Sequence, residues 1–126
     1  MSDPHWKLED NYRLLTLSFP STPPIAMKMD VRGIEEFLKN LGELRYAMKP
    51  EIPKTFARGQ QVSAVPDPAW VTEPDVMQGD SIIHIRDPRY GWLHYVFPKD
   101  EAKKLAALLQ KQAEIPPLKP ARNRVN

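Results

Sequence analysis

Apolar and polar residues alternate in two neighbouring segments near the start of the chain, residues 13–19 and 25–30. A period of two is typical of β-strands that bury one face. The Pro-rich sequence at 20–24 separates the two segments and favours a turn. The pattern therefore predicts a β-hairpin, whose apolar side consists of Leu15, Leu17, Ile25, Met27 and Met29.

The period changes after this hairpin, because apolar residues then recur every three or four positions as far as Met48. This spacing predicts an amphipathic helix over residues 31–48. Asp30 is the type of residue that caps a helix N-terminus, and Pro50 disfavours helix at the residue before it. The apolar stripe of the helix consists of Ile34, Phe37, Leu38, Leu41, Leu44 and Met48.

The second half of the chain repeats this plan, displaced by 68 positions. Strands are predicted at 81–85 and 92–97, followed by a helix at 98–113. The repeated unit is a hairpin followed by a helix, 13–48 and 81–114. Neither unit can bury its apolar face alone, so we expect the two to share one core. The predicted fold is a single α+β domain, residues 1–126, with one mainly antiparallel sheet and both helices on one face.

The length of the second hairpin connection decides which residues share a face, since a slip of one residue exchanges the two faces. A four-residue turn pairs Arg86 with Leu93, whereas a five-residue connection pairs Arg86 with Trp92. By analogy with the first hairpin we adopt the longer connection, which places His84 opposite His94. The face turned away from the helices then carries Ile82, His84, Arg86, Trp92, His94 and Val96.

Two Pro-rich segments lie outside the repeated units. The connector, residues 49–80, has one segment with the pattern of a short strand, 60–65, and otherwise lacks a period. Trp70 is expected in a loop here, where it either anchors the connector on the core or contacts another chain. The tail, residues 115–126, is basic and contains a match to a polyproline recognition pattern at 117–122, which is common by chance.

Composition narrows the class of protein. The chain has 126 residues, 41% of them apolar, and a net charge of +2. This charge is too balanced to indicate nucleic acid or membrane as a partner. The absence of cysteine excludes disulfides, thiolate metal sites and a cysteine nucleophile. We find neither an apolar run of membrane-spanning length nor a signal-peptide core, so the expected compartment is the cytoplasm.

The outer hairpin face favours protein binding as the function, because it is too apolar to leave in water and is rich in interface-forming residue types. The expected partner is protein, either a second copy or a larger assembly, and no enzyme activity, cofactor or metal ion is expected. The predicted binding residues are Ile82, His84, Arg86, Arg89, Tyr90, Trp92, His94 and Trp70.

Two alternatives remain open. Residues 89–95, RYGWLHY, are similar in part to the RNA-recognition-motif signature, so Trp92 with Arg86 and Arg89 could bind single-stranded nucleic acid. The first glycine of that signature is missing, and the order of elements differs from that of the family. His84 and His94 could instead form a metal or acid–base site, although zinc requires three or four ligands and no third is evident.

Overall fold

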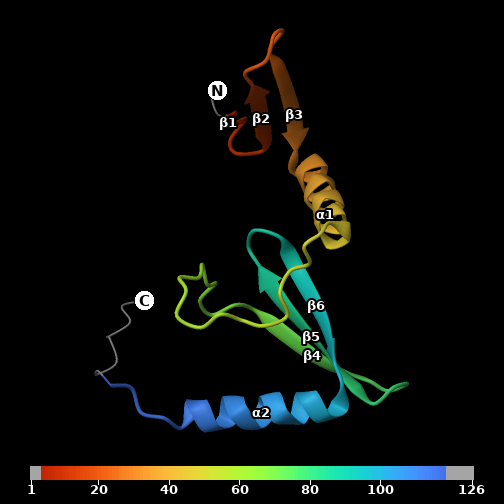
Figure 1. The fold of residues 1–126 in the computed structure, drawn as a ribbon, viewed down its shortest axis with the longest axis vertical. Helices are drawn as coiled ribbons and strands as arrows, with labels where there is room; N and C mark the ends of the chain where they lie inside the picture. The colour runs from red at the N-terminus through yellow and green to blue at the C-terminus, as the bar shows by residue number, and fades with distance from the viewer. Residues whose placement is uncertain (1–3, 119–126) are drawn as a thin grey trace. The chain divides into compact units, whose positions relative to one another are not determined.

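The computed structural model describes residues 4–118, which form six strands and two helices. The chain divides into two compact units, Met1–Val62 and Ser63–Asn126. Each unit contains a three-stranded antiparallel sheet and one helix, so the α+β class is confirmed (Figure 1). That the whole chain is a single domain stays a prediction. Residues 119–126, which include the basic residues of the tail, lie outside the described part of the chain.

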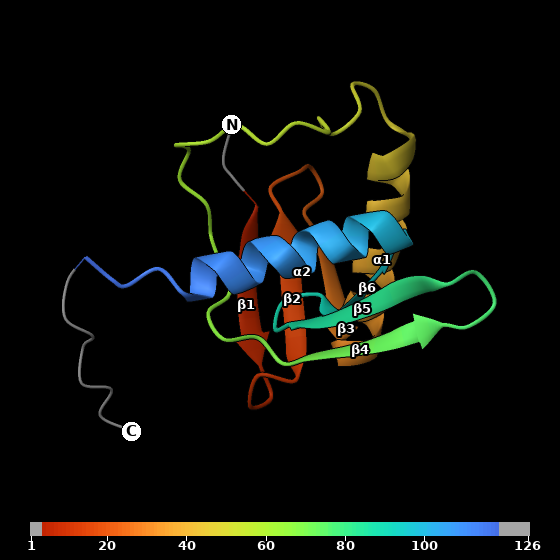
Figure 2. The ribbon, with the colours of Figure 1, turned by 90° about the horizontal axis from the view of Figure 1, so that it is seen from below.

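In the first unit, strand β2 (Leu14–Phe19) lies between β1 (His5–Glu9) and β3 (Ile25–Asp30). Leu17 is opposite Met27, which confirms the predicted hairpin register and its apolar face. On the other side of Leu17 lies Trp6 of β1, so the apolar face extends across all three strands. The strands of each sheet lie side by side in both views (Figure 1, Figure 2).

Helix α1 (Val31–Ala47) runs on directly from the end of β3 (Figure 1). The side chain of Asp30 accepts a hydrogen bond of 2.8 Å from the backbone N–H of Gly33, which confirms the predicted N-cap. At the other end, the N–H of Met48 donates to the carbonyls of Leu44 and Arg45. The helix contacts β3, the strand that leads into it.

In the second unit, β5 (Asp80–Asp87) lies between β4 (Trp70–Asp75) and β6 (Gly91–Phe97). Arg86 is opposite Trp92 and His84 is opposite His94, so the predicted five-residue register is confirmed. Gly91 has φ of 86°, in the left-handed region that glycine adopts without strain as it ends the turn.

Helix α2 (Lys99–Ala113) follows β6 after Pro98 and contacts β5. It has no side-chain cap, but Asp100 and Glu101 lie in its first turn, where the helix dipole favours acids. A groove of about 530 Å³ separates the helix from the inner face of its sheet. The groove is lined by Pro68, Trp70, Thr72, Ile83, Ile85, Tyr95, Phe97, Leu105 and Leu109.

The prediction of one sheet with both helices on one face is wrong, because the described residues form two three-stranded sheets, and each helix contacts a strand of its own unit. Each half of the chain supplies a third strand of its own. β1 pairs with β2, the first strand of the first predicted hairpin, and β4 pairs with β5, the first strand of the second. Trp70, expected in a loop, is the first residue of β4, and the strand expected at 60–65 is irregular chain. A repeated pattern marks both missed strands, since Pro-x-Trp-x-x-Glu occurs at residues 4–9 and again at 68–73.

Burial is shallow throughout the described residues. No apolar residue between 4 and 118 is fully buried, and Asp87 is the buried polar residue, at 8% exposed. The apolar stripes of both helices remain accessible, as Leu41 and Leu109 illustrate. Neither helix of this part of the chain is long and apolar enough to cross a membrane.

Candidate functional site

The candidate site is the face of the β4–β5–β6 sheet that points away from the groove, here called the outer face. Its central residues form three rungs, a rung being the set of residues directly opposite one another on neighbouring strands. The rungs are Glu73–Ile82–Val96, Val71–His84–His94 and Arg86–Trp92. Val71, Trp92 and Val96 are large apolar residues that are 45% to 60% exposed, so the face offers apolar surface to a partner.

A pair of histidines occupies the middle rung. Nδ1 of His84 lies 2.8 Å from Nδ1 of His94, and the rings meet edge to face with centroids 5.0 Å apart. The two residues are directly opposite on antiparallel strands, which brings their side chains within reach of each other. This is a hydrogen bond between two imidazoles, and it needs one ring to donate and the other to accept.

Glu73 extends this contact into a chain of three side chains. Its Oε1 lies 3.1 Å from Nε2 of His84, although the two residues belong to adjacent rungs. The carboxylate can only accept when it is ionised, so Nε2 of His84 carries a proton in this arrangement. The side chain of Glu73 is 56% exposed and that of His84 is 23% exposed. The chain Glu73–His84–His94 therefore begins in solvent at the edge strand β4 and crosses the sheet.

The number of protons in this chain is limited by its geometry. With both rings neutral, His94 donates from Nδ1 to His84. With one extra proton on His84, that ring carries hydrogen on both nitrogens and donates to Glu73 and to His94, whose own hydrogen then lies on Nε2. A second extra proton would place a hydrogen on each Nδ1, so that two donors face each other across 2.8 Å. The contact between the rings therefore tolerates one extra proton and is broken by two.

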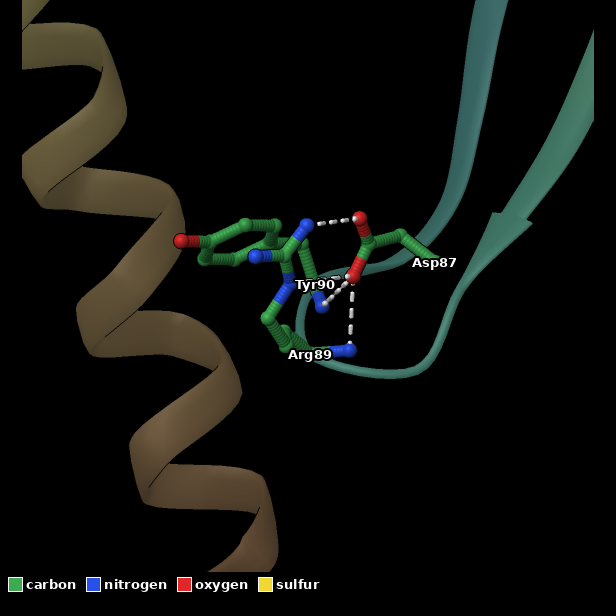
Figure 3. Close-up of polar contacts among 3 residues, drawn as sticks. All are labelled: Asp87, Arg89 and Tyr90. Carbon is green, nitrogen blue, oxygen red and sulfur yellow. Dashed lines mark hydrogen bonds and ion pairs between the residues drawn. The ribbon is translucent and has the colours of Figure 1, made fainter. Parts of the chain in front are cut away.

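At the end of the β5–β6 hairpin, Asp87 organises the turn (Figure 3). Its carboxylate accepts hydrogen bonds from the backbone N–H groups of Arg89 and Tyr90 and from the Arg89 guanidinium, at 2.7 to 3.3 Å. The Arg89 guanidinium and backbone N–H lower the pKa of the Asp87 carboxyl below its usual value. The same ion pair raises the pKa of Arg89. The guanidinium also lies 5.3 Å from the centroid of the Tyr90 ring.

The predicted binding residues fall into three places. Ile82, His84, Arg86, Trp92 and His94 share the outer face. Arg89 and Tyr90 belong to the turn at the end of the hairpin, where Arg89 is engaged by Asp87. Trp70 lies on the opposite face, opposite Ile85, and lines the groove beside α2.

Sequence reasoning missed Val71 and Glu73, which β4 contributes to the outer face. The signal that could have found them is the second copy of the Pro-x-Trp-x-x-Glu pattern. Its recurrence indicates a strand at 70–75 equivalent to β1, with Glu73 in the position of Glu9. Among the described residues, no group of three or more His, Asp or Glu side chains is arranged to hold a metal ion.

Comparisons of the chain with protein-family models, with curated proteins and with solved structures find no match.

Proposed function

We propose that the chain is a non-enzymatic protein-binding module of the cytoplasm, which acts as a homodimer or as the accessory subunit of a larger assembly. The observation that carries this proposal is the outer face of the second sheet. It combines exposed apolar residues, such as Trp92 and Val96, with the two histidines and Arg86. Trp and Arg are enriched among the residues that dominate interface energies.

The charges on this face favour a second copy as the occupant. Glu73 lies on the first rung and Arg86 on the third, with the Val71–His84–His94 rung between them. A two-fold axis along the middle rung, between two stacked sheets, turns the second copy end for end. Arg86 of each copy then approaches Glu73 of the other, and Trp92 packs over Val96. The face is thus complementary to itself in charge and in the placement of its apolar residues, as a two-fold interface requires.

The expected dimer is a weak one. A face of three short strands is small beside the ~800 Å² per partner that stable complexes bury. We therefore expect dissociation at concentrations on the order of micromolar, where light scattering can follow both species.

The test is the molar mass of the wild type and of two matched variants, measured by light scattering over a range of concentrations. Trp92→Glu places a charge on the outer face of the second sheet. Ala26→Glu makes the same change at the corresponding outer position of the first sheet, beside its own hairpin turn. We expect a dimer for the wild type and Ala26→Glu, and a monomer for Trp92→Glu. A wild type that stays monomeric, or a Trp92→Glu variant that dimerises equally, would contradict the homodimer.

The nucleic-acid alternative receives less support, because one of its two arginines is already engaged. The guanidinium of Arg89 donates to both carboxylate oxygens of Asp87, leaving less charge to meet phosphate. Fluorescence anisotropy with a labelled single-stranded RNA separates the two functions. Binding that weakens steeply with added salt would favour the nucleic-acid function.

A further inference from the structure

We propose that the dimer formed through the outer face is controlled by protons, and that the His84–His94 pair is the control element. This inference rests on the proposed homodimer. The pair accepts one extra proton while its Nδ1–Nδ1 hydrogen bond persists, and a second proton breaks that bond. The doubly protonated pair then repels itself and its symmetry mate, so the dimer dissociates.

The first step of the argument is the position of the pair. In the two-fold arrangement, the axis runs along the rung that holds both histidines. Four imidazoles, two from each copy, therefore line the centre of the interface. A charge introduced there appears on both copies, and the sheet of the other copy shields it from water. Removing an unpaired charge from water is costly, and like charges facing each other add to the cost.

The second step is the charge that surrounds the pair. Oε1 of Glu73 lies 3.1 Å from Nε2 of His84, so this carboxylate is placed to face a positive charge on that ring. The other charged groups at outer positions of the three strands are Asp75 on β4, and Asp80 and Arg86 on β5. Asp75 and Asp80 oppose each other two rungs from the histidines, and Arg86 is on the rung next to them. One carboxylate thus compensates one proton on His84, while His94 has Arg86 as its charged neighbour.

The third step is the comparison with the first sheet, where the corresponding glutamate has a different neighbour. Glu9 accepts a 2.9 Å hydrogen bond from the hydroxyl of Thr16, and Thr16 is opposite Lys28. A hydroxyl and an ammonium group do not change charge between about pH 5 and pH 8, whereas imidazoles do. The proton-sensitive chain is therefore a property of the second sheet.

The protonation of the pair can be measured without any dimer, by NMR titration of the ring C–H signals. The chain has three histidines, so the signals are few enough to assign. In the monomeric Trp92→Glu background, we expect the signals of His84 and His94 to change together, because the two Nδ1 atoms share one hydrogen bond. Adding His94→Gln should remove this coupling, because the amide can donate to His84 but cannot take up a proton.

The effect on the dimer is measured by sedimentation equilibrium at about pH 7.5 and about pH 5, on either side of the imidazole range. We expect the dimer to weaken at least about tenfold at the lower pH. His94→Gln should reduce this dependence to a few-fold or less, whereas the control His5→Gln should retain it.

The outcomes separate the two proposals. A wild type that is monomeric at both pH values overturns the homodimer and this inference with it. A dimer of equal or greater affinity at the lower pH overturns the inference alone. So does independent titration of the two rings, or a His94→Gln variant whose pH dependence equals that of the wild type.

Discussion

The two sheets of this protein share one framework. In the first, Trp6, Leu17 and Met27 lie opposite one another, and in the second, Trp70, Ile85 and Leu93 do the same. Both sheets have a glutamate on the edge strand, Glu9 and Glu73, whose carboxylate reaches a residue on the central strand one rung away. The repeated pattern of tryptophan and glutamate thus has the same structural role twice.

The outer faces of the two sheets differ in what the framework presents. The middle rung of the first sheet holds Lys7, Thr16 and Lys28, which suit contact with water. The corresponding rung of the second sheet holds Val71, His84 and His94. Backbone pairing and inner-face packing therefore leave the outer face free to vary, and a binding surface can be added to one unit without changing the other.

The largest effect is expected from exchanging the middle rungs. Replacing His84→Thr together with His94→Lys gives the second sheet the corresponding residues of the first. In the proposed dimer this places two ammonium groups at the two-fold axis, so we expect association to weaken by about 100-fold or more. Sedimentation equilibrium measures it.

The reciprocal change, Thr16→His with Lys28→His, serves as the control. It should leave the dimer intact, because the first sheet is not part of the proposed interface. A loss of the dimer with the reciprocal change would remove the distinction between the two outer faces.

The two tryptophans should contribute to stability to a similar extent. Trp6 and Trp70 are 69% and 66% exposed and occupy the same position in their sheets. Truncation to alanine removes the cross-strand neighbour of Leu17 or of Ile85 and part of a buried surface, so we expect each to cost about 1 to 2 kcal/mol. Urea denaturation of Trp6→Ala and Trp70→Ala provides the comparison. A large effect at one tryptophan and none at the other would show that the shared framework is energetically unequal.

The two helix N-termini should respond differently to loss of an acid. Asp30 accepts a hydrogen bond from the first turn of α1, so Asp30→Ala should cost about 1 kcal/mol. Asp100 acts on α2 through its charge alone, and Asp100→Asn should cost about 0.5 kcal/mol or less. Thermal unfolding monitored by circular dichroism measures both. Equal costs would mean that the capping hydrogen bond adds nothing to the charge.

The smallest effect is expected at the hairpin turns, since the Arg89 side chain of the Asp87–Arg89 pair is 46% exposed and ion pairs open to solvent contribute little. The Arg89 contacts lower the pKa of Asp87 in the folded chain, so Asp87 adds stability above its usual pKa of about 3.8. This contribution is lost as the pH falls through the lower, folded-state pKa. The turn of the first sheet uses the hydroxyl of Ser21, which donates to the carbonyl of Pro23 and does not titrate.

Asp87→Asn should therefore reduce the loss of stability in acid, as measured by urea denaturation between about pH 5 and pH 2. The matched variant Ser21→Ala should leave the acid dependence as it is in the wild type. An Asp87→Asn variant with the full acid dependence would show that other carboxylates account for it.

The sequence predicted those features that depend on local periodicity. The register of both hairpins, the opposition of His84 and His94, and the cap at Asp30 all follow from alternation, turn length and capping preference. The third strand of each sheet was missed, although β4 is as long as β2 and β3. β4 contains Pro74, a residue that argues against a strand. At the edge of a sheet Pro74 is tolerated, because its missing N–H can face away from the neighbouring strand.

The hydrogen-bonded chain at the site lay beyond sequence reasoning for the same reason. Without β4, Glu73 had no place on the outer face, and the histidine pair had no carboxylate beside it. Which nitrogen of each ring meets the other depends on side-chain rotamers, and periodicity carries no information about those.

A charge exchange across the proposed two-fold interface tests the central claim most directly. Glu73→Lys makes each copy present an ammonium group to Arg86 of the other, and Arg86→Glu makes each copy present a second carboxylate to Glu73 of the other. Like charges then meet at both contacts, so each variant alone should be monomeric. In an equimolar mixture, the new ammonium group of the Glu73→Lys copy faces the new carboxylate of the Arg86→Glu copy. At the other contact, Arg86 of the first copy faces Glu73 of the second. Opposite charges meet at both contacts, so we expect dimers that contain one copy of each variant. A mixture that remains monomeric under conditions in which the wild type dimerises would contradict the account.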